Sequence, residues 1–568
     1  MIQVEQLQAF NGFGTGVPSN VYGIATGEYF YSQGLQRTQF GVAPKFSISE
    51  EVNDSTLSNL QLVNWFAQGP FTNPYVYGFA SDGRLYRAQV PAGSWSQQRA
   101  VNSVSSHGNG LIFDQKNRLL YANDEFLGMT SDGSTFTDNW KDLTLSTTDF
   151  RPMDTYEDWV VIGNINQVAL LNVTDDSFNA NALNLPSGFN IRCIKSGING
   201  ILIGANFNNR GALILWDAFS TRSIAPWIWR NKNIRSIITT DSGWIVITQD
   251  EIFFTNGYSV QPIITDFPDY IINDQSILDV LLPQGADVRG NHLLFWGTSP
   301  RPNRQKGGFY RLDLKRNLFD FIPVANNVTT SALATGAIFL DSSNITHLSY
   351  TTTGTTNTKF IGRLNNSPAA HPYFISEQLG QSDNEKVAEA VKLSLGLSSY
   401  QTNTPDITLN IAVKIANARR NLFGWGRTNN TSAQANILNV DGTLASSSGI
   451  NRAQAGDEVT ILEGANAGQI RHITSIANQG TSTETWTLDS NLPSNTVSNI
   501  TFNVSPFKLA TVFSLSNISE LKELFFDVQD KIKGKKFLIK ILFENLPTGL
   551  IPELKGGQFI YDELGLKR

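Results

Sequence analysis

The side chains best suited to bind a ligand form a short run in which aromatic and basic residues alternate. Trp227, Trp229 and Arg230 are followed by Lys232 and Arg235. Indole rings stack on sugars and on nucleic-acid bases, and nearby cations strengthen such contacts. The run therefore has the chemistry of a glycan-binding or nucleic-acid-binding surface. The same pattern also fits the outer strand of a β-sheet with a solvated end, and we favour this second interpretation.

A second basic segment lies between two apolar runs. It contains Arg301, Arg304 and Lys306 within the sequence RPNRQK. Such a loop could contact nucleic acid or another subunit. Charged side chains are mostly exposed in folded proteins, so we favour a solvated hairpin tip.

Catalytic chemistry finds little support in the sequence. Glycosidases need two carboxyl groups on opposite sides of a cleft. The candidate acids are all explained as solvated loop charges: Asp154, Glu157, Asp158, Asp175 and Asp176. Residues 130–136, TSDGSTF, are similar to the Asp-box repeat of sialidase-type propeller enzymes, but one residue is missing before the aromatic position, and the motif occurs once. We predict no catalytic residue and no enzyme activity, with a glycosidase as the least favoured alternative.

Metal and cofactor sites are also unsupported. The histidines lie far apart and show no HxxH or HExxH spacing: His107, His292, His347, His371 and His472. His292 and His347 lie within apolar runs, which favours core positions for both. The glycine-rich segment 11–16 has no downstream Lys-Ser or Lys-Thr, so it does not read as a nucleotide-binding loop. We expect no metal and no cofactor.

Composition indicates a chain of short strands and tight turns. Among 568 residues, 46 are glycine and only 16% are charged, against about 25% in an average protein. The net charge of −6 argues against a dedicated nucleic-acid binder, which usually has a basic face. The single cysteine, Cys193, cannot form an intrachain disulfide and favours assembly in a reducing cytoplasm. Neither a secretory signal nor a membrane-spanning run is evident, so we expect no membrane insertion.

A sequence repeat covers residues 56–376 and must position the candidate binding residues named above. Its unit is an apolar run, a turn and a second apolar run, and successive copies are spaced by roughly 36 to 49 residues. The copies begin at Tyr75, Leu111, Trp159, Ile201, Trp244, His292 and Ala337. The inner strands of a propeller blade are covered on both faces, so they read as continuous apolar runs. We therefore predict an all-β chain that starts with a β-propeller of about seven blades. A pair of β-sandwiches is the alternative.

The regions outside the repeat follow other patterns. Residues 1–55 have few periodic apolar runs and are expected to form an N-terminal arm. Residues 407–415 and 537–543 alternate strictly between apolar and polar, which predicts half-buried strands of a β-sandwich built from residues 377–427 and 504–568. A polar segment, 428–503, is expected to form a small β-barrel inserted in this sandwich. Residues 519–530, SELKELFFDVQD, are the best candidate for a short helix.

Several segments resemble tailed-bacteriophage virion structural proteins. They are TGEYF at 26–30, LQRTQFGVAP at 35–44, GDEVTILEGANAGQIRHITSI at 456–476, TWTLDSNLP at 485–493 and FIYDELGLKR at 559–568. The nearest resemblance is to propeller-bearing tail nozzle or tail-hub proteins. The resemblance implies assembly rather than catalysis, and it transfers no functional residue.

The resemblance leads to a functional expectation. The chain would be part of a virion tail, assembled in the host bacterial cytoplasm, and would form a ring of about six copies with other tail proteins as partners. Such a ring could let genomic DNA pass transiently through its channel, and a tail tip could contact a host-surface receptor. The alternative is a propeller module that recognises a cell-surface glycan or protein.

Overall fold

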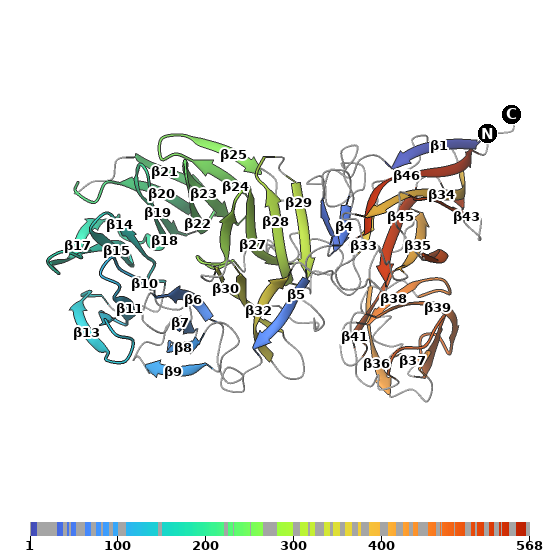
Figure 1. The fold of residues 1–568 in the computed structure, drawn as a ribbon, viewed down its shortest axis with the longest axis horizontal. Helices are drawn as coiled ribbons and strands as arrows, with labels where there is room; N and C mark the ends of the chain where they lie inside the picture. The colour runs from blue at the N-terminus through green and yellow to red at the C-terminus, as the bar shows by residue number, and fades with distance from the viewer. Residues whose placement is uncertain are drawn as a thin grey trace.

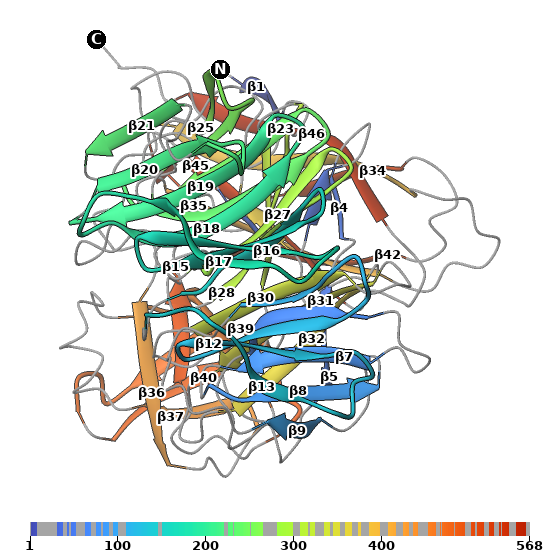
Figure 2. The ribbon, with the colours of Figure 1, turned by 90° about the vertical axis from the view of Figure 1, so that its left-hand side faces the viewer.

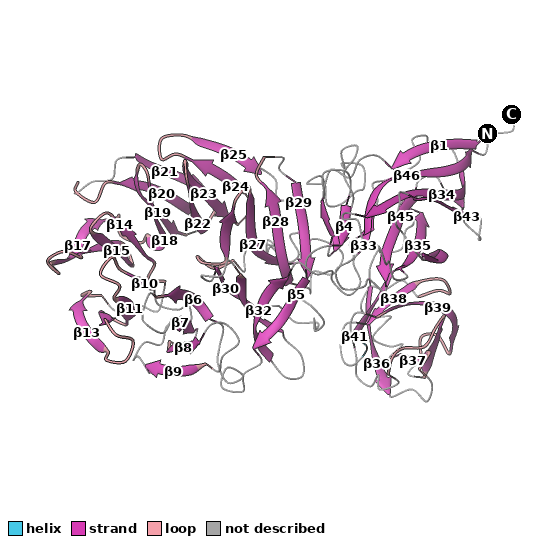
Figure 3. Cartoon of the chain, viewed as in Figure 1, coloured by secondary structure: helices cyan, strands magenta, loops and turns pink. Residues whose placement is uncertain are grey.

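The computed structural model consists of strands and turns throughout its described residues, which contain no helix (Figure 3). It describes residues 2–7, 31–33, 35–37, 42–44, 47–52, 63–69, 75–80, 83–89, 95–99, 110–145, 150–208, 210–220, 225–230, 232–249, 251–264, 281–298, 307–315, 318–323, 334–340, 345–352, 358–365, 373–375, 386–397, 407–415, 424–430, 435–440, 453–461, 466, 469–481, 483–494, 501–505, 508–515, 522–527, 533–534, 537–544 and 552–563. Since these residues form no helix, none of them belongs to a helix long enough to cross a membrane.

Seven four-stranded antiparallel sheets occupy the described residues of the N-terminal two-thirds. The first three are β6 to β9 (Val63–Gln68, Tyr75–Ala80, Leu85–Gln89, Ser96–Arg99), β10 to β13 (Leu111–Phe113, Leu119–Asn123, Phe126–Thr130, Thr137–Asp142) and β14 to β17 (Met153–Tyr156, Trp159–Asn164, Gln167–Asn172, Phe178–Asn184). The next three are β18 to β21 (Asn190–Gly197, Gly200–Phe207, Arg210–Trp216, Ala225–Arg230), β22 to β25 (Ile234–Thr240, Gly243–Thr248, Ile252–Thr255, Val260–Ile264) and β26 to β29 (Ala286–Arg289, His292–Thr298, Gly307–Asp313, Leu318–Pro323). The last combines β30 (Ala334–Leu340), β31 (Thr346–Thr352) and β32 (Thr358–Asn365) with β5 (Ser47–Val52).

The seven sheets form a ring. Their first strands, β6, β10, β14, β18, β22, β26 and β30, each contact the next in this order, and β30 contacts β6. Figure 1 shows the sheets arranged around a common centre. A circular array of four-stranded antiparallel sheets is a β-propeller. The β-propeller expected from the repeat is therefore confirmed, and each predicted pair of apolar runs forms two adjacent strands of one sheet.

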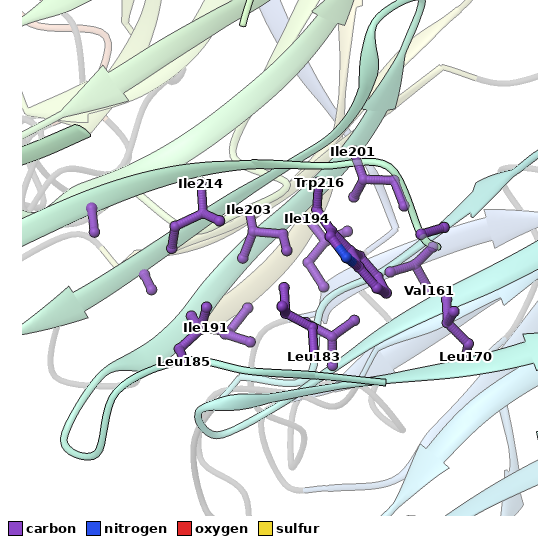
Figure 4. Packing of buried hydrophobic residues seen from close by; sticks show 14 residues of the cluster. Val161, Leu170, Leu183, Leu185, Ile191, Ile194, Ile201, Ile203, Ile214 and Trp216 are labelled. Carbon is purple, nitrogen blue, oxygen red and sulfur yellow. The ribbon is translucent and has the colours of Figure 1, made fainter. Parts of the chain in front are cut away.

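The ring is held together by apolar side chains between neighbouring sheets. The cluster between the third and fourth sheets includes Val161 and Leu170 from one side and Ile203 and Trp216 from the other, and Trp216 is fully buried (Figure 4). Because both faces of the middle strands are covered, consecutive residues are buried, as in β23. This explains the continuous apolar runs in the sequence.

Glycines occur in turns that need a left-handed backbone. Gly83, Gly133 and Gly257 have φ angles of 78°, 70° and 92°. Other residues rarely adopt such values, whereas glycine does so at little cost. These three positions agree with the tight turns that the glycine-rich composition indicates.

The N-terminal segment is not an arm in its described parts. β1 (Ile2–Leu7) pairs with β46 (Pro552–Glu563), β2 (Tyr31–Gln33) pairs with β33 (Tyr373–Ile375), and the β3–β4 hairpin (Leu35–Arg37, Val42–Pro44) joins β46. β5 completes the last sheet of the ring by pairing with β32. Residues 1–55 thus contribute to three sheets, because their strands hydrogen-bond to partners that lie far along the chain.

Two further sheets lie beside the propeller. One has the order β3-β4-β46-β34-β43, with β1 also on β46 and β44 on β34; it includes β34 (Lys386–Leu397), β43 (Lys522–Asp527) and β44 (Lys533–Gly534). The other has the order β2-β33-β45-β35-β42, with β35 (Ile407–Ile415), β42 (Lys508–Leu515) and β45 (Phe537–Glu544). Phe537 of the second sheet and Phe559 of the first are fully buried, with ring centroids 5.1 Å apart, so the two sheets share a core.

A closed barrel follows β35 in the sequence. Its strands are β36 (Gly424–Asn430), β37 (Ile437–Val440), β38 (Glu458–Ile461), β39 (Ile470–Ala477), β40 (Glu484–Leu488) and β41 (Thr501–Ser505). Its entry and exit strands pair, with Gly424 opposite Val504. Trp486 and Phe502 fill its core at 5.1 Å between ring centroids. In Figures 1 and 2 the barrel and the two chain ends lie at opposite ends of this part of the molecule.

The predicted helix at 519–530 is wrong. Its centre forms β43, which pairs antiparallel with β34 and places Leu524 opposite Leu393. In a strand, adjacent side chains point to opposite faces, and Phe525 is 61% exposed. The short apolar run fits a half-buried strand, and pairing with β34 overrides the weak helical pattern.

We expect Ile203→Ala to lower the free energy of unfolding by about 2–5 kcal/mol, because it leaves a cavity in a fully buried cluster. The matched control is Ile198→Ala on a turn of the same sheet, where the side chain is 76% exposed; it should change stability by less than about 0.5 kcal/mol. Chemical denaturation of both variants measures the difference. Equal losses would contradict the packing of this cluster.

Candidate functional site

Charged residues lie on the first strands of several sheets, which contact one another around the ring. Asp154 lies on β14, Lys195 on β18, and Asp287 and Arg289 on β26, and all four are half-buried. Asp287 and Arg289 form an ion pair, while Oδ2 of Asp154 accepts a hydrogen bond from the backbone N–H of Ser196 at 2.6 Å. These groups make the centre of the ring the strongest candidate for a small-ligand site.

The electrostatics of this site are set by burial. Burial raises the pKa of Asp287, against the opposing effect of the Arg289 charge. Burial also lowers the pKa of Arg289. Nε of Arg289 and Oγ of Ser196 are buried with no hydrogen-bond partner among the described residues. A polar ligand with oxygen acceptors would satisfy both groups.

Residues 281–285, here called the central segment, cross the middle of the ring just before β26. The carbonyl of Leu281 accepts a hydrogen bond from Arg192 of β18 at 2.9 Å, and that of Pro283 accepts one from Ser236 of β22 at 2.7 Å. On the other side, the carbonyl of Gln284 accepts a hydrogen bond from the N–H of Ile338 in β30 at 2.7 Å.

The side chain of Gln284 extends this network to the first sheet. Its Oε1 accepts a hydrogen bond from the backbone N–H of Phe66 in β6 at 2.9 Å. Leu282 packs against the apolar cluster of the first two sheets. The central segment therefore contacts at least four first strands of the ring. No sequence motif marks this segment.

A recurring turn follows the third strand of several sheets. At residues 130–136, Oδ1 of Asp132 accepts hydrogen bonds from the N–H groups of Ser134 and Thr135 at 2.8 and 2.7 Å, which lower the pKa of this carboxyl group. Asp217 and Asn256 accept the same pair of hydrogen bonds from the residues two and three positions later. The Asp-box-like motif is thus a structural turn that recurs with different residues.

The predicted aromatic and basic run is divided between two sheets of the ring. Trp227, Trp229 and Arg230 lie on β21, the outermost strand of the fourth sheet, as the favoured interpretation predicted. Lys232 forms an ion pair with Glu251. Arg235 lies on β22, a first strand at the centre of the ring. Lys232 also forms a β-bridge with Arg210 of β20, the residue before the partner of Trp229. Only Arg235 is therefore moved to a different part of the ring.

The structure describes only some of the other residues singled out in the sequence. Arg301, Arg304 and Lys306 lie outside the described residues, between β27 and β28. His347 is 2% exposed, as expected of a core residue. His292 is half-buried, and its Nε2 lies 2.7 Å from a guanidinium nitrogen of Arg311. Burial lowers the pKa of His292. Within the described ranges, no three histidine, cysteine or acidic residues are grouped to hold a metal ion.

We expect Gln284→Ala to destabilise the protein by about 1–3 kcal/mol, because it leaves the buried N–H of Phe66 without its acceptor. Gln261→Ala on β25, where the side chain is exposed, is the control and should have almost no effect. Thermal and denaturant unfolding of both variants test the role of the central segment. A neutral Gln284→Ala variant would show that this segment does not hold the ring.

The single cysteine should be inert in the folded protein. Cys193 is 3% exposed on β18, and burial raises the pKa of its thiol to about 12. Thiol–disulfide exchange requires the thiolate. At pH 8 we therefore expect no reaction with Ellman's reagent under native conditions and full reaction in guanidinium chloride. Rapid native labelling would contradict the burial of Cys193.

Comparisons with known proteins identify no family. No protein-family model matches the sequence, and no curated protein matches it. Among solved structures, the extracellular domain of BT4673 from B. thetaiotaomicron has 13% identity and a TM-score of 0.40, with 60% of this chain and 43% of that chain covered. The Neurospora crassa Pan2 WD40 domain has 8% identity and a TM-score of 0.38, covering 57% and 95%. YCF48 bound to D1 peptide has 10% identity and a TM-score of 0.39, covering 59% and 99%.

These structural similarities assign no function to this chain. The chain spans less than half the length of the BT4673 domain that it matches. At such low identities and TM-scores, the assignment of the β-propeller rests on the sheets of this structure and on their circular order.

Proposed function

We propose that the chain is a structural component of a tailed-phage virion, located in the tail nozzle, hub or tip. The location of the resembling segments supports this proposal. Residues 35–44 contain β3 and β4, and residues 559–563 end β46 in the same sheet. Residues 456–476 and 485–493 contribute to the closed barrel. The described parts of these segments lie outside the propeller, so the proposal assigns assembly contacts to the C-terminal sheets and the barrel.

The observation that carries the proposal is the pairing of the start of the chain with its end. β1 pairs with β46 over its whole length, from Ile2 opposite Asp562 to Leu7 opposite Gly557. The chain also passes to the propeller between β4 and β5 and returns between β32 and β33. The propeller and the C-terminal sheets are therefore joined by two connections, and residues 1–55 contribute strands to both parts. These links restrain motion between the two parts. A stiff unit of this kind suits a static, load-bearing assembly.

The proposal includes the finer architecture. The seven sheets are the complete set of blades, and β5 closes the ring as the outer strand of the last one. The two C-terminal sheets form a β-sandwich, with the barrel inserted between β35 and β42. The paired barrel strands β36 and β41 support this insertion, because they bring its two ends together.

Copies of the chain form a ring in this proposal, with about six copies as the expected symmetry. The net charge of −6 supports a channel through which DNA passes without strong binding, since tight binding requires cations at the phosphates. Other tail proteins are the remaining partners.

A binding module for a cell-surface glycan or protein is the second candidate. Trp227 and Trp229 lie on the edge strand β21, separated by one residue and opposite Leu213 and Gly211. An edge strand has one side without a strand partner, where a ligand can approach. This function is compatible with a tail location.

Light scattering with negative-stain imaging of the purified chain tests the assembly proposal. We expect ring-shaped oligomers of about six copies whose fraction rises with protein concentration. A dilution series of the same sample is the control, because specific rings dissociate in discrete steps while aggregates do not. A monomer at all concentrations, with no ring in any image, would contradict the proposal.

A further inference from the structure

Among the described residues, three large apolar side chains are strongly exposed on neighbouring sheets of the propeller. Ile198 is 76% exposed, Phe219 is 69% exposed and Tyr258 is 62% exposed. Ile198 lies in the turn between β18 and β19, Phe219 in the turn after β20, and Tyr258 in the turn between β24 and β25. Single exposed apolar residues are common, but neighbouring ones often mark an interaction site.

The three turns lie at the same end of the ring. In a four-stranded antiparallel sheet, the turn after the first strand and the turn after the third strand are at the same end. The first strands β18 and β22 run in the same direction, because Arg192 bonds to the Arg235 carbonyl and Thr239 bonds to the Ser196 carbonyl. Ile198, Phe219 and Tyr258 therefore share one surface, here called the turn face.

Contacts between the turns make this surface continuous. Nδ2 of Asn199 donates a hydrogen bond to the carbonyl of Asn256 at 2.8 Å. A Cβ atom added to Gly257 would lie 3.0 Å from the Leu215 side chain, so the turn that carries Tyr258 packs closely on the fourth sheet.

The turns are also held in fixed conformations. Asp217 and Asn256 bond to the backbone of their own turns. Nε1 of Trp216 donates to the Ser220 carbonyl at 2.6 Å, and Oγ1 of Thr255 donates to the Ser259 carbonyl at 2.7 Å. Preorganised turns lose little conformational entropy on binding, so the exposed side chains are well suited to hold a partner.

The charge around these side chains is negative. Glu157 and Asp158 are exposed in the turn between β14 and β15, and Asp241 is exposed in the turn between β22 and β23. These turns follow first strands of the third and fifth sheets, so they belong to the turn face. The described residues in the turns after the first and third strands of sheets three to five include no lysine or arginine. Lys116 and Arg118 of the second sheet reach the turn after β16, where both pair with Asp176. Glu157, Asp158 and Asp241, beside sheets three to five, form no ion pair with another described residue.

We propose that the turn face binds a protein segment in which an apolar side chain is flanked by lysine or arginine. The apolar side chain packs against Ile198, Phe219 and Tyr258, while the basic residues face the acidic turns. The negative charge disfavours nucleic acid, whose phosphates need cations. This interaction is independent of the tail function proposed above, and it uses neither the charged centre of the ring nor β21.

Selection from a displayed library of random peptides against the purified full-length chain tests this proposal. We expect enrichment of peptides with an apolar residue beside lysine or arginine. Synthetic copies should bind at least about tenfold more weakly to the triple variant Ile198→Ser/Phe219→Ser/Tyr258→Ser. Phe525→Ser, at a 61% exposed position on β43, is the matched control and should bind as the unchanged chain does. The unfolding midpoints of both variants confirm that they are folded.

A charge-reversal variant provides a second test that does not alter the apolar residues. Asp241→Lys with Glu157→Lys should weaken binding of the basic peptides and remove most of its salt dependence. Enrichment of acidic peptides, no enrichment, or equal binding to the triple variant would overturn the proposal. Loss of self-association in the triple variant would also overturn it, because the turn face would then be a contact between copies of the chain.

Discussion

The structure depends on the need to cover both faces of every sheet in the ring. The middle strands are apolar on both sides, as in β23, where consecutive residues are buried. One sheet cannot bury itself, so each needs a neighbour on either side, and only a closed circle supplies neighbours for all of them. The contact between β30 and β6 closes this circle. The last sheet takes its outer strand from residues 47–52, which joins the two ends of the propeller by hydrogen bonds.

This closure explains which parts of the fold could be predicted from the sequence. The apolar runs at Trp159 and Trp244 mark middle strands, because burial on both faces leaves a clear local signal. The partners of β1 and β5 have no such signal, since their pairing depends on strands hundreds of residues away. The helix predicted at residues 519–530 was wrong for a related reason. Their short apolar run fits a helix or a strand, and only the pairing with β34 decides between them.

The candidate site was less predictable than the fold. Asp154 was interpreted from the sequence as a solvated loop charge, yet it lies on β14, a first strand at the centre of the ring. The central segment carries no motif, because its role depends on backbone carbonyls that any sequence provides. The turn at Asp132 was recognised as a single motif, but Asp217 and Asn256 make the same hydrogen bonds with other residues around them. Hydrogen-bond geometry repeats here where residue identity does not.

Closure of the ring also decides where partners can bind. Packing between sheets occupies the faces of the middle strands, and the central segment occupies space among the first strands. The remaining surfaces are the outer strands and the turns at the two ends. Outer strands offer unpaired backbone groups, while turns can project large side chains without exposing the core. Turns fixed by Asp217 and Asn256 can therefore carry exposed residues such as Phe219 and Tyr258 at no cost to the packing that closes the ring.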